Sequence, residues 1–338
     1  MSKPDAIVAL AETAMRQTLR RLRGADRSAP RWSLHGRMFD QAALLVQFYY
    51  AISLFMLYRR AREMAGLGRT SPELDALWPI KWVELTGLEL GGAMMAHLAI
   101  GAGLLGLLLW RRLWVRMLVS LALLQYVALN NSQGFMGHGF HSWFWLSVAF
   151  WFLPSGSLRR LRETRRGRFR FLLGFSAAPA VMLLFYSLSG CYKLVAAIAA
   201  LFTGEASGLA PNAMAMTLAW RTFETGSEPY WAPLIIELPW LGWPLYLGLY
   251  YIEVVALIIL LRPRLHQSWG VLLILFHVGT FLFMDITFPE HVLINALFLV
   301  MSPFALGLHD PVMALRALPV IGLLFRSLDR RPRWSADR

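Results

Sequence analysis

Long apolar stretches along the chain alternate with short clusters of charged residues. Eight of these stretches are about 17 to 25 residues long, the length that a helix needs to cross a roughly 30 Å hydrocarbon core. Apolar runs such as LLGLLLW lack the period-two alternation of a transmembrane β-strand. The pattern therefore predicts an all-α fold, a polytopic bundle of about eight transmembrane helices. We place the spans at about residues 40–58, 91–110, 113–131, 140–156, 171–192, 243–261, 267–285 and 291–308.

The same pattern divides the chain into one large domain and two short ends. A basic cytoplasmic or interfacial segment covers residues 1–38, the transmembrane domain covers 39–308, and an interfacial, basic tail covers 309–338. The largest predicted loop, residues 196–242, lies on the outer side. Aromatic residues in and beside this loop suit an interfacial cap. They are Trp220, Tyr230, Trp231, Trp240 and Trp243.

Composition and charge support the membrane class and predict an orientation. Apolar residues make up 57% of the chain and charged residues 16%, whereas about a quarter of the residues in a soluble domain are charged. When the loops are assigned alternately to two sides, most of the 33 Lys and Arg residues fall on the side of both termini. The positive-inside rule then predicts cytoplasmic termini in a plasma (inner) membrane. The first outer loop is the exception, because it holds Arg59, Arg60, Arg62, Arg69 and Lys81.

The basic residues and the single cysteine limit which classes of partner and cofactor we expect. The net charge of +13 comes mainly from residues beside the spans, where they orient helices and contact anionic lipid. We therefore expect membrane lipid as a partner, and no nucleic acid. The single cysteine, Cys191, excludes an intrachain disulfide and a cysteine-based metal site. His138 and His141 have i, i+3 spacing, but one HxxH pair is weak evidence for a metal, so no metal is predicted.

Two ionisable residues fall near the middle of predicted spans, where a charge is costly and indicates function. Glu253 lies in LYLGLYYIEVVALIILL and His277 lies in VLLILFHVGTFLFMD, at similar depths in consecutive antiparallel helices. We expect the two side chains to meet. Such a pair is either a structural hydrogen bond between helices or part of a catalytic or proton-handling site.

Lys193 closes the predicted fifth span. Tyr186 and Gly190 share its helix face by their i, i+4, i+7 spacing, and Gly190 would let a backbone or a ligand approach closely. A lysine at a helix end often only extends its amine toward water. In a dry site, by contrast, loss of hydration favours a neutral amine that can act as a base. The residues alone leave both interpretations open.

Further polar residues gather near the outer ends of the predicted spans, above Glu253 and His277. Under the assigned topology they predict a polar funnel that opens outward. Taken singly, several of them suit capping or solvated positions equally well. The set comprises Asn130, Asn131, His138, His141, Lys193, Asp285, Glu290 and His291.

Several segments, in this order along the chain, resemble the HTTM proteins, the membrane superfamily that includes the vitamin K-dependent γ-glutamyl carboxylases. The sequence YSLSGCYKL resembles the Y-x-x-[SA]-G-x-x-K-L element of that family, and the similarity covers roughly residues 40–308. Each motif is loose, and the ordered set is more specific than any one of them. The segments are NN…HSWFWLSVAF (130–150), YSLSGCYKL (186–194), the segment around Glu253, and FH…FP…MSPF (276–304).

The resemblance implies a cofactor and two residue roles. In the carboxylases the lysine of this element is regarded as the base that deprotonates a reduced quinone, which then reacts with oxygen. By resemblance Lys193 would be that base, and His141 or His138 would be the histidine that stabilises the quinone oxygen. A reduced, vitamin K-like quinone is the implied cofactor. Because the carboxylases continue into a large lumenal domain and the segment 309–338 is short, we do not expect carboxylation of peptides.

The sequence therefore favours a quinone- and oxygen-dependent membrane enzyme, a carboxylase-like lyase or oxidoreductase with an outward-facing pocket. Lys193 is the predicted base, His141 the oxyanion partner, and Glu253 with His277 the polar floor. The alternative is a transporter or lipid-binding membrane component in which Glu253, His277 and Lys193 line a polar path. A mainly structural subunit is the third class.

These classes predict different surroundings for the same residues. An enzyme should place Lys193 in a pocket that opens to lipid or to the outer face. A transporter should continue a polar route past Glu253 toward the cytoplasm. A structural subunit should leave Lys193 in water and Glu253 enclosed by partners.

Overall fold

A computed structural model of the chain describes residues 31–66, 76–86, 92–132, 139–305 and 318–319. Within these ranges the regular secondary structure is helical, and no strand occurs. The four helical segments long and apolar enough to cross a membrane are His35–Arg59, Leu113–Asn131, Arg165–Thr203 and Pro263–Met284. Two shorter apolar helices cover His97–Leu109 and Pro289–Val300. The expected all-α membrane class is confirmed.

Each of the eight apolar stretches coincides with a helix or with consecutive helical elements. They are α2 (Arg31–Gly66), α4 (Gly92–Leu109), α5 (Leu113–Asn131), α6 (Gly139–Ala149) with η2 (Phe150–Phe152), α8 (Arg165–Thr203), α11 (Pro239–Val254) with α12 (Ala256–Ile259), α13 (His266–Met284), and α14 (Pro289–Asn295) with the π-helical η4 (Ala296–Val300). Short elements connect them, namely η1 (Trp78–Ile80), α3 (Lys81–Thr86), α7 (Leu158–Glu163), α9 (Ala213–Thr225), α10 (Ala232–Glu237) and η3 (Pro263–Leu265).

The helix boundaries differ from the expected spans in several places. α2 begins at Arg31, inside the segment assigned to the N-terminal end, and α8 continues to Thr203. α8 has 39 residues and is therefore about 58 Å long, well beyond the hydrocarbon thickness. Helix propensity does not end where hydropathy falls, and the alanine-rich end of α8 favours continuation. The predicted loop 196–242 contains α9 and α10. The predictions for residues 1–30, 306–317 and 320–338 concern parts of the chain outside the described residues.

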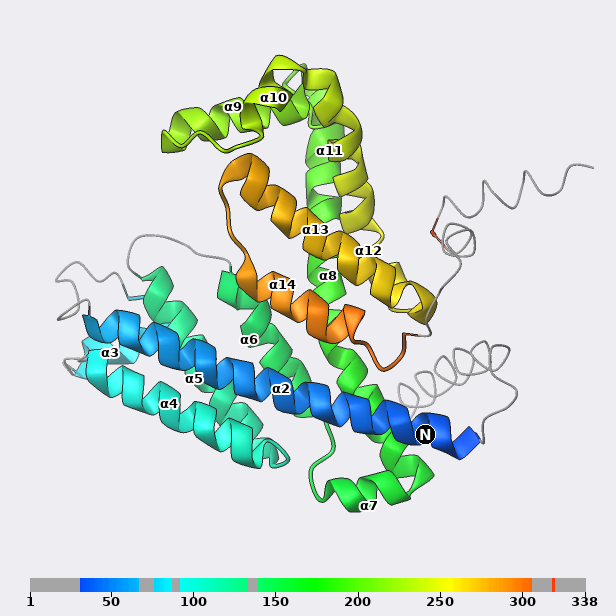
Figure 1. The fold of residues 1–338 in the computed structure, drawn as a ribbon. Coiled ribbons are helices and arrows are strands. Elements are labelled where there is room, and N and C mark those ends of the chain that lie inside the picture. Colours follow the sequence, from blue (N-terminus) through cyan, green and yellow to red (C-terminus); the bar gives the residue numbers. More distant parts are fainter. Residues whose placement is uncertain (1–30, 67–75, 87–91, 133–138, 306–317, 320–338) are drawn as a thin grey trace, which may run out of the picture.

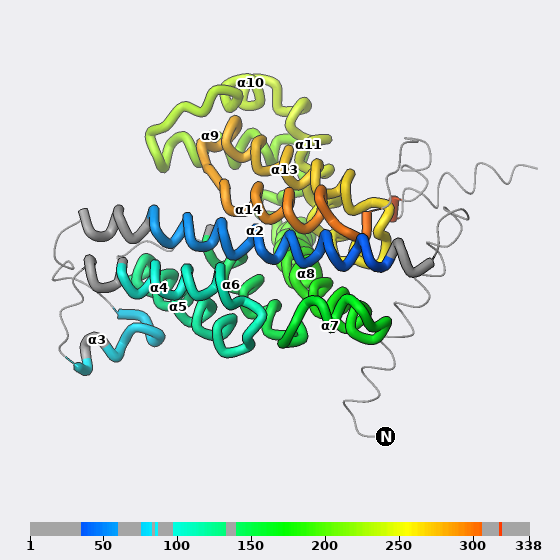
Figure 2. The backbone as a smooth tube through the Cα atoms, turned by 60° about the horizontal axis from the view of Figure 1, so that its bottom comes forward, coloured from blue at the N-terminus to red at the C-terminus, as the bar shows by residue number. Residues whose placement is uncertain are grey.

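α8 is the helix around which the others are arranged. It packs against α2, α6, α7, α11 and α12, and Figure 1 shows it running from α7 at one end of the molecule to α11 at the other. α2 and α4 lie side by side in both views (Figures 1 and 2). α14 packs against α6 and α13. This arrangement brings the ends of α6, α8, α11, α13 and α14 into one region.

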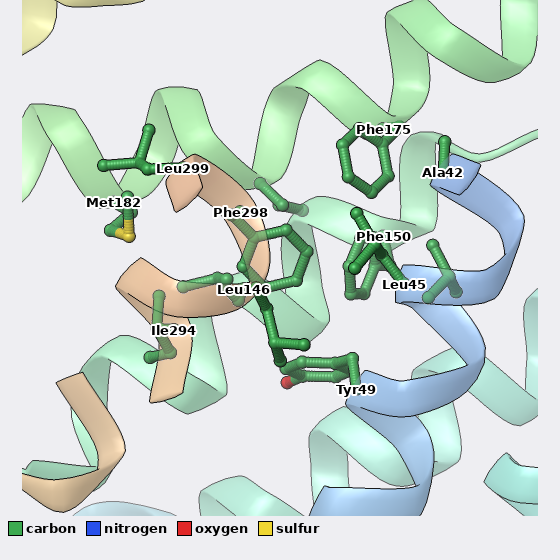
Figure 3. Packing of buried hydrophobic residues seen from close by; sticks show 14 of the residues in the cluster. Ala42, Leu45, Tyr49, Leu146, Phe150, Phe175, Met182, Ile294, Phe298 and Leu299 are labelled. Atoms are coloured by element: carbon green, nitrogen blue, oxygen red, sulfur yellow. The ribbon is translucent and has the colours of Figure 1, made fainter. Parts of the chain in front are cut away.

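The main core is rich in aromatic side chains. The rings of Tyr49 and Trp143 are stacked with centroids 4.8 Å apart, and Figure 3 shows Tyr49, Phe150 and Phe298 converging from α2, η2 and η4. The Tyr49 hydroxyl donates to the carbonyl of Trp143 at 2.7 Å, and the Trp143 indole donates to Ser53 Oγ at 2.7 Å. Buried Tyr and Trp side chains usually need a partner for their polar atoms, and both Tyr49 and Trp143 have one.

Large apolar side chains also cover the outer surface. Phe55, Leu98, Leu108, Leu188 and Leu275 are all more than half exposed. A protein in water rarely exposes so many large apolar residues on its helices, whereas lipid acyl chains solvate them without cost. The surface agrees with the hydropathy of the chain and supports a position in a membrane.

Arg116 is fully buried, unlike Arg111 and Arg112 beside it. Its guanidinium donates to the carbonyls of Trp110 at 3.0 Å and Leu153 at 2.6 Å. It also donates to Ser155 Oγ at 3.1 Å. Arg116 therefore joins the turn between α4 and α5 to the end of η2, a role that its position close to the basic pair Arg111 and Arg112 does not indicate.

Replacing Arg116 with methionine should lower the free energy of unfolding by about 2–4 kcal/mol, because two buried carbonyls lose their donor. The measurement is the unfolding temperature in mild detergent. Arg112→Met is the matched control, since that side chain lies exposed in the same turn. Equal unfolding temperatures for the two variants would show that Arg116 does not hold the turn.

Candidate functional site

α8 and α11 come into close contact at Gly190. A Cβ atom added to this glycine would lie 2.6 Å from the Cβ of Glu253 and 2.6 Å from the backbone N of Val254. Side chains do not tolerate such distances, so a glycine at this position allows the two backbones to approach. The close contact brings the C-terminal part of α8 against Glu253.

Lys193 and Glu253 form an ion pair across this contact. Lys193 Nζ donates to both carboxylate oxygens of Glu253 at 2.8 Å. The side chain of Glu253 is 3% exposed, whereas that of Lys193 is 39% exposed. A carboxylate in such surroundings is stabilised mainly by a directly bonded cation. Lys193 is therefore the charge partner of a buried glutamate and does more than reach toward water.

A cavity of about 350 Å³ lies beside the ion pair. Lys193, Tyr250 and Glu205 contribute polar or aromatic groups to its wall. Tyr192 also lines the cavity, and the remaining lining residues have small side chains. They are Ala196, Ala197, Ala200, Ala206 and Gly208. Lys193 thus lines an open cavity while its amine is bonded to Glu253.

The helix that carries Glu253 is interrupted directly after it. α11 ends at Val254 and α12 begins at Ala256. Ser187 of α8 lies at this break, where its Oγ is 3.1 Å from the Val254 carbonyl and accepts from the Leu257 N–H at 2.8 Å. A side chain that enters the hydrogen-bond ladder of a helix in this way can interrupt it without a proline.

A second polar group lies around Tyr186, which is on α8 about one helical turn before Gly190. Asn295 Nδ2 donates to the Tyr186 hydroxyl at 2.9 Å, and that hydroxyl is 2.6 Å from His277 Nε2. Since Tyr186 accepts from Asn295, its own proton is directed to His277 Nε2. His277 then carries its hydrogen on Nδ1.

Three atoms of this group have no partner among the described residues. They are His277 Nδ1, His291 Nδ1 and Asn295 Oδ1, all buried. The rings of His277 and His291 lie 4.9 Å apart between centroids. Buried polar atoms are normally paired, so the group has the capacity to bond a further polar molecule.

His141 lies on α6, where Asn131 Nδ2 is 3.0 Å from His141 Nε2. The next residue, Ser142, continues the contact toward α14, because its Oγ is 3.0 Å from His291 Nε2. α6 therefore links Asn131 at the end of α5 to the histidines of α13 and α14. The predicted polar residues Asn131, His141 and His291 belong to one connected region.

Other predicted site residues take different positions. Asn130 is half-buried at the end of α5, and Glu290 is buried in the first turn of α14. Asp285 has a φ of 54° and ends α13 in the left-handed conformation, which suits a capping role. His138 lies outside the described residues.

Glu253 and His277 do not bond to each other as expected, and each has a different partner. Glu253 bonds to Lys193, whereas His277 bonds to Tyr186. Depth in the membrane can be estimated from position along a helix, but the direction of a side chain around the helix axis cannot. Both residues still bond to α8, at Lys193 and at Tyr186, which lie about two helical turns apart.

Three residues of the region were missed in the sequence. Ser142, Ser187 and Asn295 complete the contacts described above. Asn295 could have been noticed in the sequence, because a polar amide in the apolar run VLINALFLV, four residues after His291, shares the helix face of that histidine. Among the described residues no group of three or more His, Cys, Asp or Glu side chains could hold a metal ion.

No family model matches the chain, and no curated protein or solved structure matches it. What the site can do must therefore be argued from its geometry. The fold and the site define a helical protein with apolar helices suited to a membrane, in which a buried glutamate is paired with a partly exposed lysine beside a cavity.

Proposed function

We propose that the protein is a membrane enzyme that binds a reduced quinone-type ligand in the cavity beside Lys193 and transfers a proton there. The observation that carries this proposal is the combination of a cavity-lining amine with a buried carboxylate at 2.8 Å. The resemblance of YSLSGCYKL to the HTTM element supports the same residue as the base. The enzyme class is the carboxylase-like lyase or oxidoreductase class.

The lining of the cavity fits such a ligand. Its volume of about 350 Å³ is at the lower end of the range for small-molecule sites, roughly 300–1,000 Å³. Alanine and glycine provide apolar surface for a ring or a chain, and Lys193 and Tyr250 provide polar groups for an oxygen. A reduced quinone would supply an ionisable hydroxyl group and two electrons for reaction with oxygen.

The ion pair itself explains how Lys193 can act as a base. Glu253 stabilises the protonated amine, and a protonated amine cannot accept a proton. Transfer of that proton along the 2.8 Å hydrogen bond to Glu253 would leave a neutral amine and a neutral carboxylic acid. The net charge of the pair stays unchanged, so the transfer adds no charge to a dry site. We assign proton acceptance to the pair as a unit.

We assign His141 the role of orienting or stabilising a ligand oxygen. Its bond to Asn131 fixes the ring, and the neighbouring Ser142 connects α6 to His291. The unpaired atoms His277 Nδ1 and Asn295 Oδ1 add a donor and an acceptor to the polar group around Tyr186, which lies on the same helix as Lys193. A preorganised donor is what a developing oxyanion requires.

A transport path receives less support from the geometry. Beyond Glu253, the buried side chains of α8 include the polar residues Ser187 and Tyr186. Further along, Met182 and Leu183 of α8 and Ala256 and Ile259 of α12 are buried and apolar. Within the described part of the chain these residues offer no continuing polar route at that level. A purely structural subunit would not need a cavity at Lys193.

The topology belongs to the same proposal. We propose eight spans with both termini in the cytoplasm of a plasma (inner) membrane, since each apolar stretch is helical and most basic residues fall on the side of the termini. The cavity beside Lys193, at the C-terminal end of α8, then opens toward the outer side.

Co-purification of lipids tests the proposed function. Wild type, Lys193→Ala and His141→Ala are purified in mild detergent, checked for intact folding by size-exclusion chromatography, and the retained lipids are identified by mass spectrometry. Leu188→Ala is the matched control, because this residue is exposed on the same helix.

We expect wild type and Leu188→Ala to retain a quinone, and the other two variants to retain much less. If none of the four proteins retains a quinone and all are equally stable, the redox proposal is wrong. Transport or scaffolding would then be the better interpretation.

A further inference from the structure

α9 has one apolar face buried within the protein. Ala215 and Leu218 pack against Ala232 and Ile235 of α10, and together these residues form a small core of their own. Phe283 at the end of α13 packs against this core. The buried face therefore accounts for one side of α9.

A second apolar stripe on α9 has no cover within the described structure. Met216, Ala219, Trp220 and Phe223 follow i, i+3, i+4, i+7 spacing and line a shallow groove. Trp220 is 65% exposed and Phe223 is 82% exposed. An exposed stripe of this size indicates a binding surface.

We infer that the interfacial region of the lipid bilayer covers this stripe, with α9 lying in the membrane surface. The first reason is continuity with a membrane helix. The Trp231 N–H donates to the Leu282 carbonyl of α13 at 3.2 Å, and α13 belongs to a segment long and apolar enough to cross a membrane. α9 is therefore attached at the point where such a helix ends. Figure 1 shows α9 and α10 projecting sideways at this end of the molecule.

The second reason is the chemistry of the surrounding residues. Tyr230, Trp231, Trp240 and Trp243 are all exposed in the same segment, and amphipathic aromatic rings gather at the headgroup level of bilayers. A protein partner would need to cover all of them at once, whereas a bilayer surface does so by its extent.

The charged residues of α9 indicate whether the charge of the lipid headgroups affects its insertion. The charged residues of α9 are Arg221 and Glu224, which lie 4.0 Å apart and cancel. Insertion therefore rests on apolar and aromatic burial, and it should occur equally in neutral and anionic lipid. In this respect α9 differs from the basic segment predicted at residues 1–38, whose net charge would favour anionic lipid.

The inference has a consequence for the position of the Lys193 cavity. The segment between α8 and α9 contributes Glu205 and Gly208 to the cavity wall. Ser207 Oγ donates to the Ala197 carbonyl at 2.6 Å, and the Trp243 indole donates to the Leu209 carbonyl at 3.0 Å. Because this segment is fixed to α8 and α11, an interfacial α9 places the cavity near the same membrane surface.

Site-specific quenching in lipid nanodiscs tests the inference. In a Cys191→Ser background, Phe223→Cys on the stripe and Thr225→Cys on the opposite side of α9 are labelled with the fluorophore NBD. Lipids with a nitroxide near the headgroup report contact with the bilayer, and iodide reports contact with water. Each protein is measured in neutral and in anionic nanodiscs.

The label at 223 should lose more than about half of its emission to nitroxide lipid and little to iodide, in both lipid types. The label at 225 should show the reverse. Equal iodide quenching at both positions would place the stripe in water and overturn the inference. Formation of a 223–223 disulfide without nitroxide quenching would also overturn it, because a second copy would then cover the stripe. Neither outcome depends on whether a quinone binds at Lys193.

Discussion

Replacing Lys193 with methionine is expected to lower the free energy of unfolding by about 3–5 kcal/mol, because the buried carboxylate of Glu253 loses its cation. Glu253→Gln should cost only about 1 kcal/mol. The two costs differ because the two side chains differ in exposure. Without Glu253, Lys193 can turn its charged amine toward the cavity, whereas without Lys193 the carboxylate of Glu253, 3% exposed, stays buried and unpaired. The measurement is unfolding in mild detergent, followed by temperature or denaturant.

The decisive comparison is the double variant Lys193→Met with Glu253→Gln. Removing the charge of Glu253 should restore part of the stability that Lys193→Met loses, because no carboxylate is left unpaired. A lysine that only reaches toward water would behave differently. Its replacement would change stability by less than about 0.5 kcal/mol, and the second substitution would rescue nothing. That pattern would contradict the ion pair as a structural unit.

The second large effect is expected at Gly190. Gly190→Ala should cost about 1–3 kcal/mol by overpacking, because its Cβ would lie 2.6 Å from backbone and side-chain atoms of α11. Gly190→Leu should separate α8 from α11, break the Lys193–Glu253 bond and prevent isolation of a stable protein. Expression level, size-exclusion profile and unfolding temperature measure these changes.

Gly248→Ala is the matched control for this prediction. Gly248 lies on α11, the helix that packs against Gly190 of α8, but a Cβ at position 248 meets nothing within 4 Å. Alanine there should be neutral or slightly stabilising, because it lowers the entropy of the unfolded chain and favours helix. Equal losses at Gly190 and Gly248 would mean that helix propensity and not close packing explains the glycine.

The helix positions could be predicted well from hydropathy, because a membrane helix must be both apolar and long. The break at Val255 could not. No proline or glycine occurs in IEVVALII, and the break coincides with a serine of another helix, Ser187, which bonds to the backbone there. The burial of Arg116 could not be predicted either, because its sequence context resembles that of its exposed neighbours and only the tertiary structure buries it.

The candidate site could be predicted in part for a related reason. Glu253, His277, Lys193 and Tyr186 stand out because ionisable or polar residues are rare inside apolar helices. Their partners depend on the rotation of each helix about its axis, which hydropathy does not determine. Glu253 therefore bonds to Lys193, and His277 bonds to Tyr186, in place of the expected pair.

Ligand-dependent stabilisation tests most directly whether the Lys193–Glu253 pair forms part of a quinone site. Purified protein is depleted of lipid, returned to nanodiscs and titrated with a reduced, vitamin K-like quinone under anaerobic conditions while the unfolding temperature is recorded. A ligand that binds only the folded state raises this temperature with concentration. We predict a saturable rise for wild type and for Leu188→Ala, and no rise for Glu253→Gln with Lys193→Met. No rise in any protein, or an equal rise in all of them, would contradict a quinone site at this ion pair.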